Sequence, residues 1–241
     1  MSDKREAPVS ATTAREHDIV DSALQHVWQV ANKLSQIQPP KHDNYRVTIF
    51  GSARIRPGQE LYEDVKKLAT KCAQKRCDIV TGGGPGLMQA ANEGAQLGDP
   101  DDKIQSIGIR VDLPFEQDAN AFVEDCYTHQ TFFTRLHHFI RLSNAFIVVG
   151  GGIGTTLETL MVWQLLQVRH VSDVPLIMVG PMWRGLVDWA KQYMVNHNPP
   201  LAGANDLGIP VCVDTVEEAL ALLEPHSAQF HDKTTTPSAD S

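Results

Sequence analysis

From Arg46 onward, short apolar runs alternate with longer segments that carry apolar residues at helical spacing. The runs are RVTIF, DIVT, IQSIGIRV, AFIVV, PLIMV and PVCV, and each is followed by one such helical segment. Strands that alternate with helices form a parallel sheet with helices on both of its faces. The sequence therefore predicts an α/β fold, a doubly wound parallel sheet that forms a single domain over residues 45–225.

The two ends of the chain differ from this pattern. Residues 1–12 are small and polar, which predicts a disordered N-terminus. Residues 13–38 carry apolar side chains at helical spacing and predict an amphipathic helix, which ends before Pro39 and Pro40 because proline cannot continue a helix. Residues 226–241 are polar and include TTTPSADS, so we expect a flexible tail.

The composition narrows the possible partners. The chain has 241 residues, of which 29 are acidic and 21 basic, and its formal net charge is -8. This charge argues against a nucleic-acid partner, because neutralising phosphates needs a basic surface. No apolar run approaches the roughly 20 residues that span a bilayer, and the polar N-terminus is unlike a signal peptide. We therefore expect a cytoplasmic protein with no membrane partner.

Glycine follows three of the predicted strands. The loops are GSAR from Gly51, GGGPG from Gly82 and GGGIGT from Gly150. Glycine lets backbone N–H groups approach a ligand closely, and the first N–H groups of the following helix have no partner within that helix. Together with the helix dipole they favour an anion such as phosphate. Ligands of open parallel sheets bind beyond the carboxyl ends of the strands.

The loops therefore predict a site for a phosphate or a nucleotide. Its predicted residues are Gly51, Ser52, Gly83, Gly84, Gly86, Met88, Gly151, Gly152, Gly154 and Thr155. Asn92, on the helix after the first triple glycine, either reaches a base or ribose or makes a buried structural hydrogen bond. The alternative interpretation of the loops is a set of tight turns that bind no ligand.

The common nucleotide and metal motifs are absent from the sequence. Neither triple-glycine loop matches the dinucleotide pattern G-x-G-x-x-G, and no Gly-Lys-Ser/Thr of a Walker loop occurs. These absences argue against hydride transfer and NTP hydrolysis, and they leave a mononucleotide or a sugar phosphate. No His-Glu-x-x-His or comparable spacing occurs either, so we expect no metal site.

A charged pair flanks the strand that leads into the second triple glycine. Arg135 lies on the predicted helix before this strand and Glu158 on the helix after it, so both can face the mouth of one cleft. The neighbours of Glu158 are apolar, and a carboxylate in such a helix needs a partner or a task. The helix dipole would keep it ionised. It is either half of a structural salt bridge or a carboxylate that stabilises positive charge on a substrate or directs a water molecule.

The helix that carries Glu158 is apolar nearly all round. Its apolar residues are Leu157, Leu160, Met161, Val162, Trp163, Leu165, Leu166 and Val168. A helix of this kind is buried on every side. In a chain of this length a subunit interface achieves such burial, and we therefore expect a homodimer.

Five segments carry a resemblance to a known family. FGSAR, VTGGGPGLMQAANEGA, LPFEQDAN, FFTR and GGGIGTTLE are similar to motifs of the Lonely Guy family of nucleoside 5'-monophosphate phosphoribohydrolases, long mislabelled as lysine decarboxylases. The resemblance implies a Rossmann-like fold, a dimer, and hydrolysis of the N-glycosidic bond of AMP or cytokinin nucleotides to the free base and ribose 5-phosphate. It implies Arg135 and Glu158 as catalytic residues, and no cofactor.

The chain departs from the family pattern at two positions. Gly150 stands where the family has proline, which makes the loop freer, and Leu136 stands where a lysine usually follows the arginine. The triple glycine at Gly150 is also similar to that of molybdenum-cofactor carriers, which bind a pterin phosphate without hydrolysis. A carrier is thus the main alternative, and a non-catalytic AMP-binding module is a third hypothesis.

Overall fold

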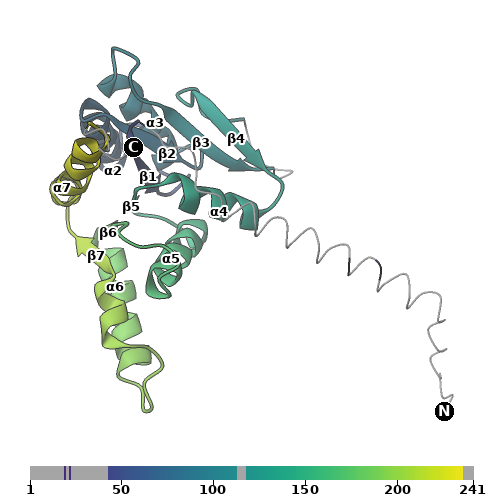
Figure 1. Cartoon of the computed structure of the whole chain (residues 1–241), viewed down its shortest axis with the longest axis vertical. Helices are drawn as coiled ribbons and strands as arrows, with labels where there is room; N and C mark the ends of the chain where they lie inside the picture. Colours follow the sequence, from purple (N-terminus) through teal and green to yellow (C-terminus); the bar gives the residue numbers. More distant parts are fainter. Residues whose placement is uncertain (1–18, 20–21, 23–42, 113–117, 236–241) are drawn as a thin grey trace, which may run out of the picture. The chain divides into compact units, whose positions relative to one another are not determined.

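The computed structural model describes residues 43–112 and 118–235, together with residues 19 and 22. The chain divides into two units, Met1–Lys41 and His42–Ser241, and the architecture below belongs to the second unit (Figure 1). The N-terminal segments predicted over residues 1–12 and 13–38 lie outside the described residues, apart from positions 19 and 22.

Seven strands of the described chain form one sheet in which all neighbours are parallel. They are β1 (Tyr45–Phe50), β2 (Cys77–Thr81), β3 (Ser106–Val111), β4 (Asp125–His129), β5 (Ala145–Val148), β6 (Leu176–Val179) and β7 (Pro210–Val213). Their order is β4-β3-β2-β1-β5-β6-β7. The chain winds outward from β1 on one side and from β5 on the other, which confirms the predicted doubly wound, Rossmann-like sheet.

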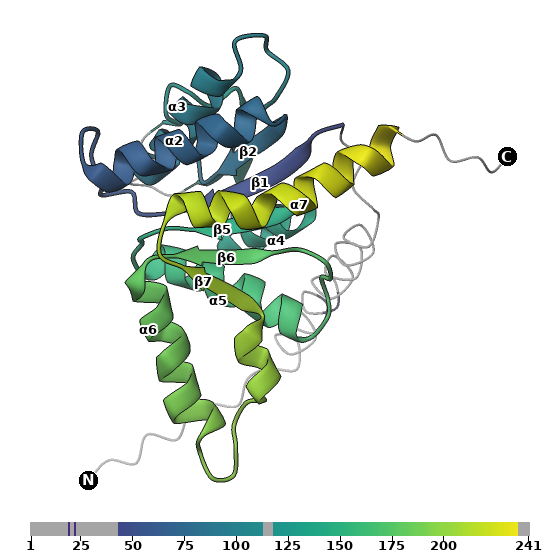
Figure 2. The ribbon, with the colours of Figure 1, turned by 90° about the vertical axis from the view of Figure 1, so that its left-hand side faces the viewer.

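Helices cover both faces of the sheet, as the strand–helix alternation predicts. They are α2 (Glu60–Gln74), α3 (Leu87–Gly98), α4 (Phe132–Leu142), α5 (Ile153–Gln167), α6 (Pro181–Ala190) and α7 (Val216–Thr235), with a π-helical turn η1 (Lys191–Val195) and a 3-10 turn η2 (Ala204–Gly208). On one face α2, α3 and α7 share a buried cluster with Ile49 and Ile79. On the other, α4, α5 and α6 share a second cluster with Phe50 and Phe146 (Figure 2).

The edge strand β4 was not among the strands expected from the sequence. Its residues DCYTH are exposed at the three central positions and half-buried at the two ends. A strand at the edge of a sheet that buries neither face fully lacks the apolar signal of a core strand. No hydrophobic period in the sequence therefore distinguishes β4 from a loop.

The last helix continues beyond the point at which the sequence was expected to become loose. α7 runs through Pro225 as far as Thr235, so residues 226–235 of the expected flexible tail are helical. The reason is packing: the Phe230 ring meets the Tyr45 ring edge-on, with the centroids 5.5 Å apart, and Ser227 is buried. One aromatic side chain in a polar segment thus ties the helix to β1.

Among the described residues, none of the helices has the length and apolar character that a membrane crossing requires.

Candidate active site

The three glycine loops meet where the strand order reverses. Ser52 N donates to Gly150 O at 3.0 Å, and Val149 N donates to Phe50 O at 2.9 Å, which joins the loops after β1 and β5. Leu87 N donates to Ser52 O at 2.9 Å and adds the first triple-glycine loop. The loops lie beyond the carboxyl ends of β1, β2 and β5, the position at which open parallel sheets bind ligands.

Two of the predicted site glycines are required by the close approach of neighbouring elements. A Cβ atom on Gly51 would lie 2.8 Å from the side chains of both Leu87 and Val149. Gly86 has a φ of +73°, and a Cβ atom there would collide with Ser52 O. These glycines bring α3 against the ends of β1 and β5, and their role in packing needs no ligand.

The first triple glycine lies directly against Arg135. A Cβ atom on Gly82 would lie 2.6 Å from Arg135 Nη2 and 2.7 Å from Met88 Sδ, and one on Gly84 would lie 2.9 Å from Met88 Cε. Gly83 has a φ of +70°, a conformation that glycine adopts without the strain of a side chain. The loop therefore leaves room for the guanidinium and for the methionine at the same point.

Asn92 supports this loop from the interior. It is fully buried, and its Nδ2 donates to Ser106 Oγ at 2.9 Å. Its Oδ1 accepts from Thr81 Oγ1 at 2.7 Å and from Asn120 Nδ2 at 3.0 Å, while Thr81 Oγ1 accepts from Gly83 N at 2.9 Å. Of the two interpretations of Asn92, the structure shows the buried structural hydrogen bond.

Asn120 is a member of the site that the sequence did not reveal. Its backbone N donates to Gly83 O at 2.9 Å, and its side-chain Nδ2 donates to Gly84 O at 3.0 Å. Asn120 ends the LPFEQDAN segment, but its contact with a loop more than thirty residues earlier depends on the tertiary fold. No local pattern could have assigned it this role.

The second triple glycine opens α5, with Gly152 as the N-cap. The first bond within the helix runs from Thr156 N to Gly152 O at 2.9 Å, so the N–H groups of the first turn have no partner inside it. A Cβ atom on Gly152 or Gly154 would meet nothing within 4 Å. Open space thus lies beside a helix N-terminus, which suits an anion.

The two threonines at the start of α5 differ in their burial. Thr155 is buried, and a Cβ atom on Gly151 would collide with its side chain. The Thr156 hydroxyl donates to Gly152 O at 3.0 Å. Thr155 is thus shielded from solvent, and half-buried Thr156 uses its hydroxyl hydrogen within its own helix, so backbone N–H groups are the donors that this loop presents.

Arg135 and Glu158 form a shielded ion pair. Arg135 Nη1 lies 2.9 Å from Glu158 Oε1, and each side chain is 12% exposed. Arg135 Nε donates to Ile109 O at 2.8 Å, and its guanidinium carbon lies 5.2 Å from the centroid of the Phe139 ring. The sequence placed these two residues on either side of one strand, and the structure brings them into direct contact.

The protonation of Glu158 depends on two opposing effects. Burial raises the pKa of Glu158 above its usual value, and the adjacent Arg135 acts in the opposite direction without cancelling the rise. The helix dipole, which favours the ionised carboxylate, is thus opposed by desolvation. A carboxyl group with a perturbed pKa in a ligand cleft is a candidate for catalysis.

The site therefore combines backbone N–H groups with the ion pair of Arg135 and Glu158. In the part of the chain that the structure describes, no group of three or more His, Cys, Asp or Glu side chains is placed to hold a metal ion. The arrangement can bind an anion and, beside it, stabilise developing positive charge or orient a water molecule.

The chain belongs to the family described as possible lysine decarboxylase, whose model matches residues 88–223. The matched region contains Arg135, Glu158 and the second triple glycine. This is the family to which the motifs of the sequence pointed under the Lonely Guy name.

One curated relative has a name that states an enzymatic activity. Over 141 residues the chain is 27% identical to the pyrimidine/purine nucleotide 5'-monophosphate nucleosidase of Escherichia coli K12. The alignment covers 56% of this chain and 31% of the relative, so the chain spans less than a third of the relative's length.

Solved structures of low sequence identity share the fold. The molybdenum cofactor binding protein of the phototrophic bacterium Rippkaea orientalis is 16% identical, with a TM-score of 0.56 over 76% of this chain and 96% of that one. The Moco carrier protein of Chlamydomonas reinhardtii is 19% identical, with a TM-score of 0.55 over 77% of this chain and 99% of that one.

Proposed function

We propose that this protein hydrolyses the N-glycosidic bond of a purine nucleoside 5'-monophosphate, either AMP or a cytokinin-type nucleotide, to the free base and ribose 5-phosphate. The observation that carries the proposal is the shielded pair of Arg135 and Glu158 beside the three joined glycine loops. The name of the Escherichia coli relative supports a nucleosidase, and so does the resemblance of the motifs to the Lonely Guy family, which the possible lysine decarboxylase model represents.

In this proposal the 5'-phosphate binds at the N-terminus of α5. The N–H groups of its first turn donate to the phosphate oxygens, and the open space at Gly152 and Gly154 accommodates them. The loops at Ser52 and at Gly83 and Gly84 close the other side of the site. Because these donors belong to the backbone, they recognise the phosphate group and not the base.

The reaction places positive charge on the ribose ring. The bond between C1' and the base nitrogen breaks, its electron pair leaves with the base, and a water molecule adds to C1'. Glu158 either stabilises the oxocarbenium-like charge or orients the water. Arg135, held by Ile109 O, fixes the orientation of Glu158. One proton of the water remains as the new hydroxyl hydrogen of the sugar, and the other ends on the base.

The deciding experiment is a panel of nucleoside monophosphates with chromatographic detection of the free base. We expect release from AMP or from its N6-prenylated form, unchanged by EDTA, and a loss of at least about 10²-fold in kcat for Glu158→Gln. Release of base from none of the monophosphates would refute the proposal. Molybdopterin that copurifies with an inactive protein would favour the carrier, and saturable AMP binding without product would favour a binding module.

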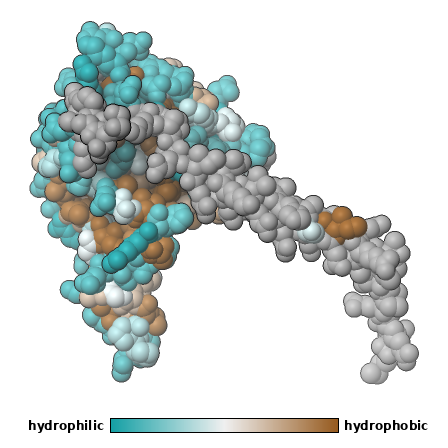
Figure 3. All heavy atoms as spheres, viewed as in Figure 1, coloured by the Kyte–Doolittle hydropathy of each residue, from teal (hydrophilic) through white to brown (hydrophobic). Residues whose placement is uncertain are grey.

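We further propose that the chain acts as a homodimer through α5. The helix leaves Ile153 88%, Leu157 49% and Leu160 44% exposed, and exposed apolar side chains also gather over α5 and α6 in Figure 3. The burial on every side that its composition predicts is therefore incomplete in one chain, and a second copy would complete it.

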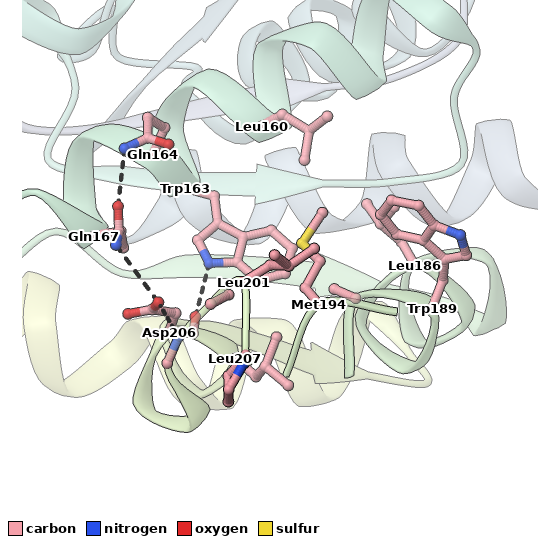
Figure 4. Close-up of a pocket in the computed structure, with 14 residues that line it drawn as sticks. Leu160, Trp163, Gln164, Gln167, Leu186, Trp189, Met194, Leu201, Asp206 and Leu207 are labelled. Atoms are coloured by element: carbon pink, nitrogen blue, oxygen red, sulfur yellow. Dashed lines mark hydrogen bonds between the residues drawn. The ribbon is translucent and has the colours of Figure 1, made fainter. Parts of the chain in front are cut away.

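A groove continues this apolar surface. It has a volume of ≈ 780 Å³ and is lined by side chains of α5, α6 and η1 and by residues 200–203, 206 and 207. In Figure 4 the side chains of Leu160, Trp163, Leu201 and Trp189 border it, and Trp163 Nε1 donates to Asp206 O at 2.8 Å.

Light scattering coupled to size-exclusion chromatography tests the homodimer. The wild-type protein should have the mass of a dimer, and the Leu160→Glu variant should have the mass of a monomer. A wild-type monomer at micromolar concentration would contradict the dimer.

A further inference from the structure

A pair of hydrogen-bonded histidines lies one helical turn from Arg135. His129 is the last residue of β4, and His138 lies on α4 three positions after Arg135. His129 Nε2 and His138 Nδ1 are 2.9 Å apart, and their rings are inclined at 68°. The neutral pair shares one proton across this contact, whichever nitrogen carries it.

The hydrogen bond between His129 and His138 joins α4 to the edge strand β4. The central residues of β4 are exposed, whereas Phe139 and Ile140 on the opposite face of α4 are buried in the core. Besides the histidine pair, the Tyr127 ring meets the His138 ring edge-on, with the centroids 4.8 Å apart. His129 O also accepts from Asp112 N at 2.7 Å, which fixes the end of β4 to the end of β3.

The position of α4 decides where the guanidinium of Arg135 lies. Arg135 reaches two elements at once, Ile109 O on β3 at 2.8 Å and Glu158 on α5 at 2.9 Å. A shift of α4 along β4 would lengthen one of these contacts or both. Arrangements of catalytic groups lose rate steeply when they are displaced, even by about 1 Å.

The surroundings keep both rings neutral. Burial lowers the pKa of His138 to about 4, and His129, Arg141, Arg46 and His137 add to the effect. Burial also lowers the pKa of His129, and Arg135 adds to that effect. The charged groups that face the pair from α4 and from β1 are thus cationic, although Arg46 is itself paired with Asp78 at 3.0 Å. A neutral hydrogen bond is the form that this environment favours.

We propose that His129 and His138 are positioning residues for the proposed nucleosidase reaction. Phe139 and Ile140 pack α4 into the core, and the histidine hydrogen bond adds a polar contact to β4 one turn from Arg135, which refines the position of the guanidinium between Ile109 and Glu158. This inference rests on the proposed function, because it concerns the rate of that reaction. The pair does not touch the phosphate site at α5, so its loss affects kcat and leaves KM nearly unchanged.

The test compares variants that remove the bond with variants that keep it. His138→Leu and His129→Leu should each lower kcat by roughly five- to tenfold, with KM within about twofold of wild type. The double variant should lose no more than either single one, because both remove the same contact. His138→Asn places an amide near the position of Nδ1 and should retain most of the activity. His226→Leu, at an exposed histidine of α7, is the matched control.

The outcomes separate this inference from the proposed function. Wild-type protein that releases no base refutes both. Wild-type protein that releases base, together with folded leucine variants of unchanged kcat, refutes the positioning role alone. A fall in melting temperature without a fall in kcat also refutes it, since a purely structural bond would behave in this way. If His138→Leu does not fold, His129→Leu on the exposed edge strand and His138→Asn decide the question.

Discussion

The substitution Gly154→Ala separates the requirements of the helix from those of a ligand. Gly154 lies in the first turn of α5, and a Cβ atom there would meet nothing within 4 Å. Alanine forms helices better than glycine by up to about 1 kcal/mol. If the glycine served only the turn, the variant would be at least as stable and as active as the wild type.

The proposed phosphate site leads to a different result for activity. The new methyl group would occupy the open space beside the N–H groups of the first turn. Displacing the phosphate from one charge-assisted hydrogen bond, worth about 1.5–3 kcal/mol, would raise KM by roughly 10- to 100-fold. The melting temperature should stay level or rise by up to about 2–4 °C.

Gly185→Ala is the matched control for this experiment. Gly185 lies within α6, and a Cβ atom there would also meet nothing within 4 Å. The control should gain the same stability and keep its KM. Steady-state kinetics of base release and thermal unfolding followed by circular dichroism measure both quantities. An unchanged KM for Gly154→Ala, with the protein folded, would refute the placement of the phosphate at α5.

Other perturbations address Arg135 and Glu158. The Cβ atom of Gly82→Ala would displace Arg135 Nη2 and Met88 Sδ. Both atoms lie near the ends of flexible side chains, so the variant should fold and its kcat should fall by roughly 10²-fold. A kcat near that of the wild type would contradict a role for this contact in catalysis. Because burial raises the pKa of Glu158, activity that needs the carboxylate should fall as the pH drops through this raised value, above the usual range near 4.3. Glu158 then binds its proton more tightly in the folded state than in the unfolded state. The free energy of unfolding, measured by urea denaturation, should therefore fall as the pH rises through this raised pKa, and Glu158→Gln should lack this fall. If the stability of the wild type and that of Glu158→Gln depend on pH in the same way, the raised pKa of Glu158 is refuted.

The order of the elements follows from the sequence because core strands and helices have distinct periods. Six of the seven strands and the helices that follow them were predicted from apolar runs such as RVTIF and AFIVV. The edge strand β4 was not predicted, since Cys126 and Tyr127 are exposed and leave no apolar period. The extent of α7 was underestimated because the single contact between Phe230 and Tyr45 is a property of the folded chain.

Part of the candidate site could likewise be predicted from the sequence, and part could not. Glycines that end strands, and a charged residue on either side of one strand, are local signals, and they pointed to Arg135 and Glu158 as partners. The carbonyl of Ile109 carries no such signal, because every residue has a backbone carbonyl. The amide of Asn120 carries none either, because its role depends on where the loops meet in the folded chain. The Thr156 hydroxyl is likewise engaged by Gly152 O in the folded helix, a contact that the sequence does not specify.

Gly150 illustrates how neighbouring elements can replace a local constraint. The sequence suggested that glycine in place of the family's proline makes this loop freer. In the structure Gly150 O accepts from Ser52 N at 3.0 Å, and a Cβ atom on Gly150 would lie 3.0 Å from Leu61 Cδ2, closer than side chains normally pack. The loop is therefore held by the loop after β1 on one side, and Leu61 of α2 approaches it on the other. A side chain at this position would require only a small shift of the end of the Leu61 side chain, so the shape of the loop rests on its tertiary hydrogen bond more than on the choice of glycine.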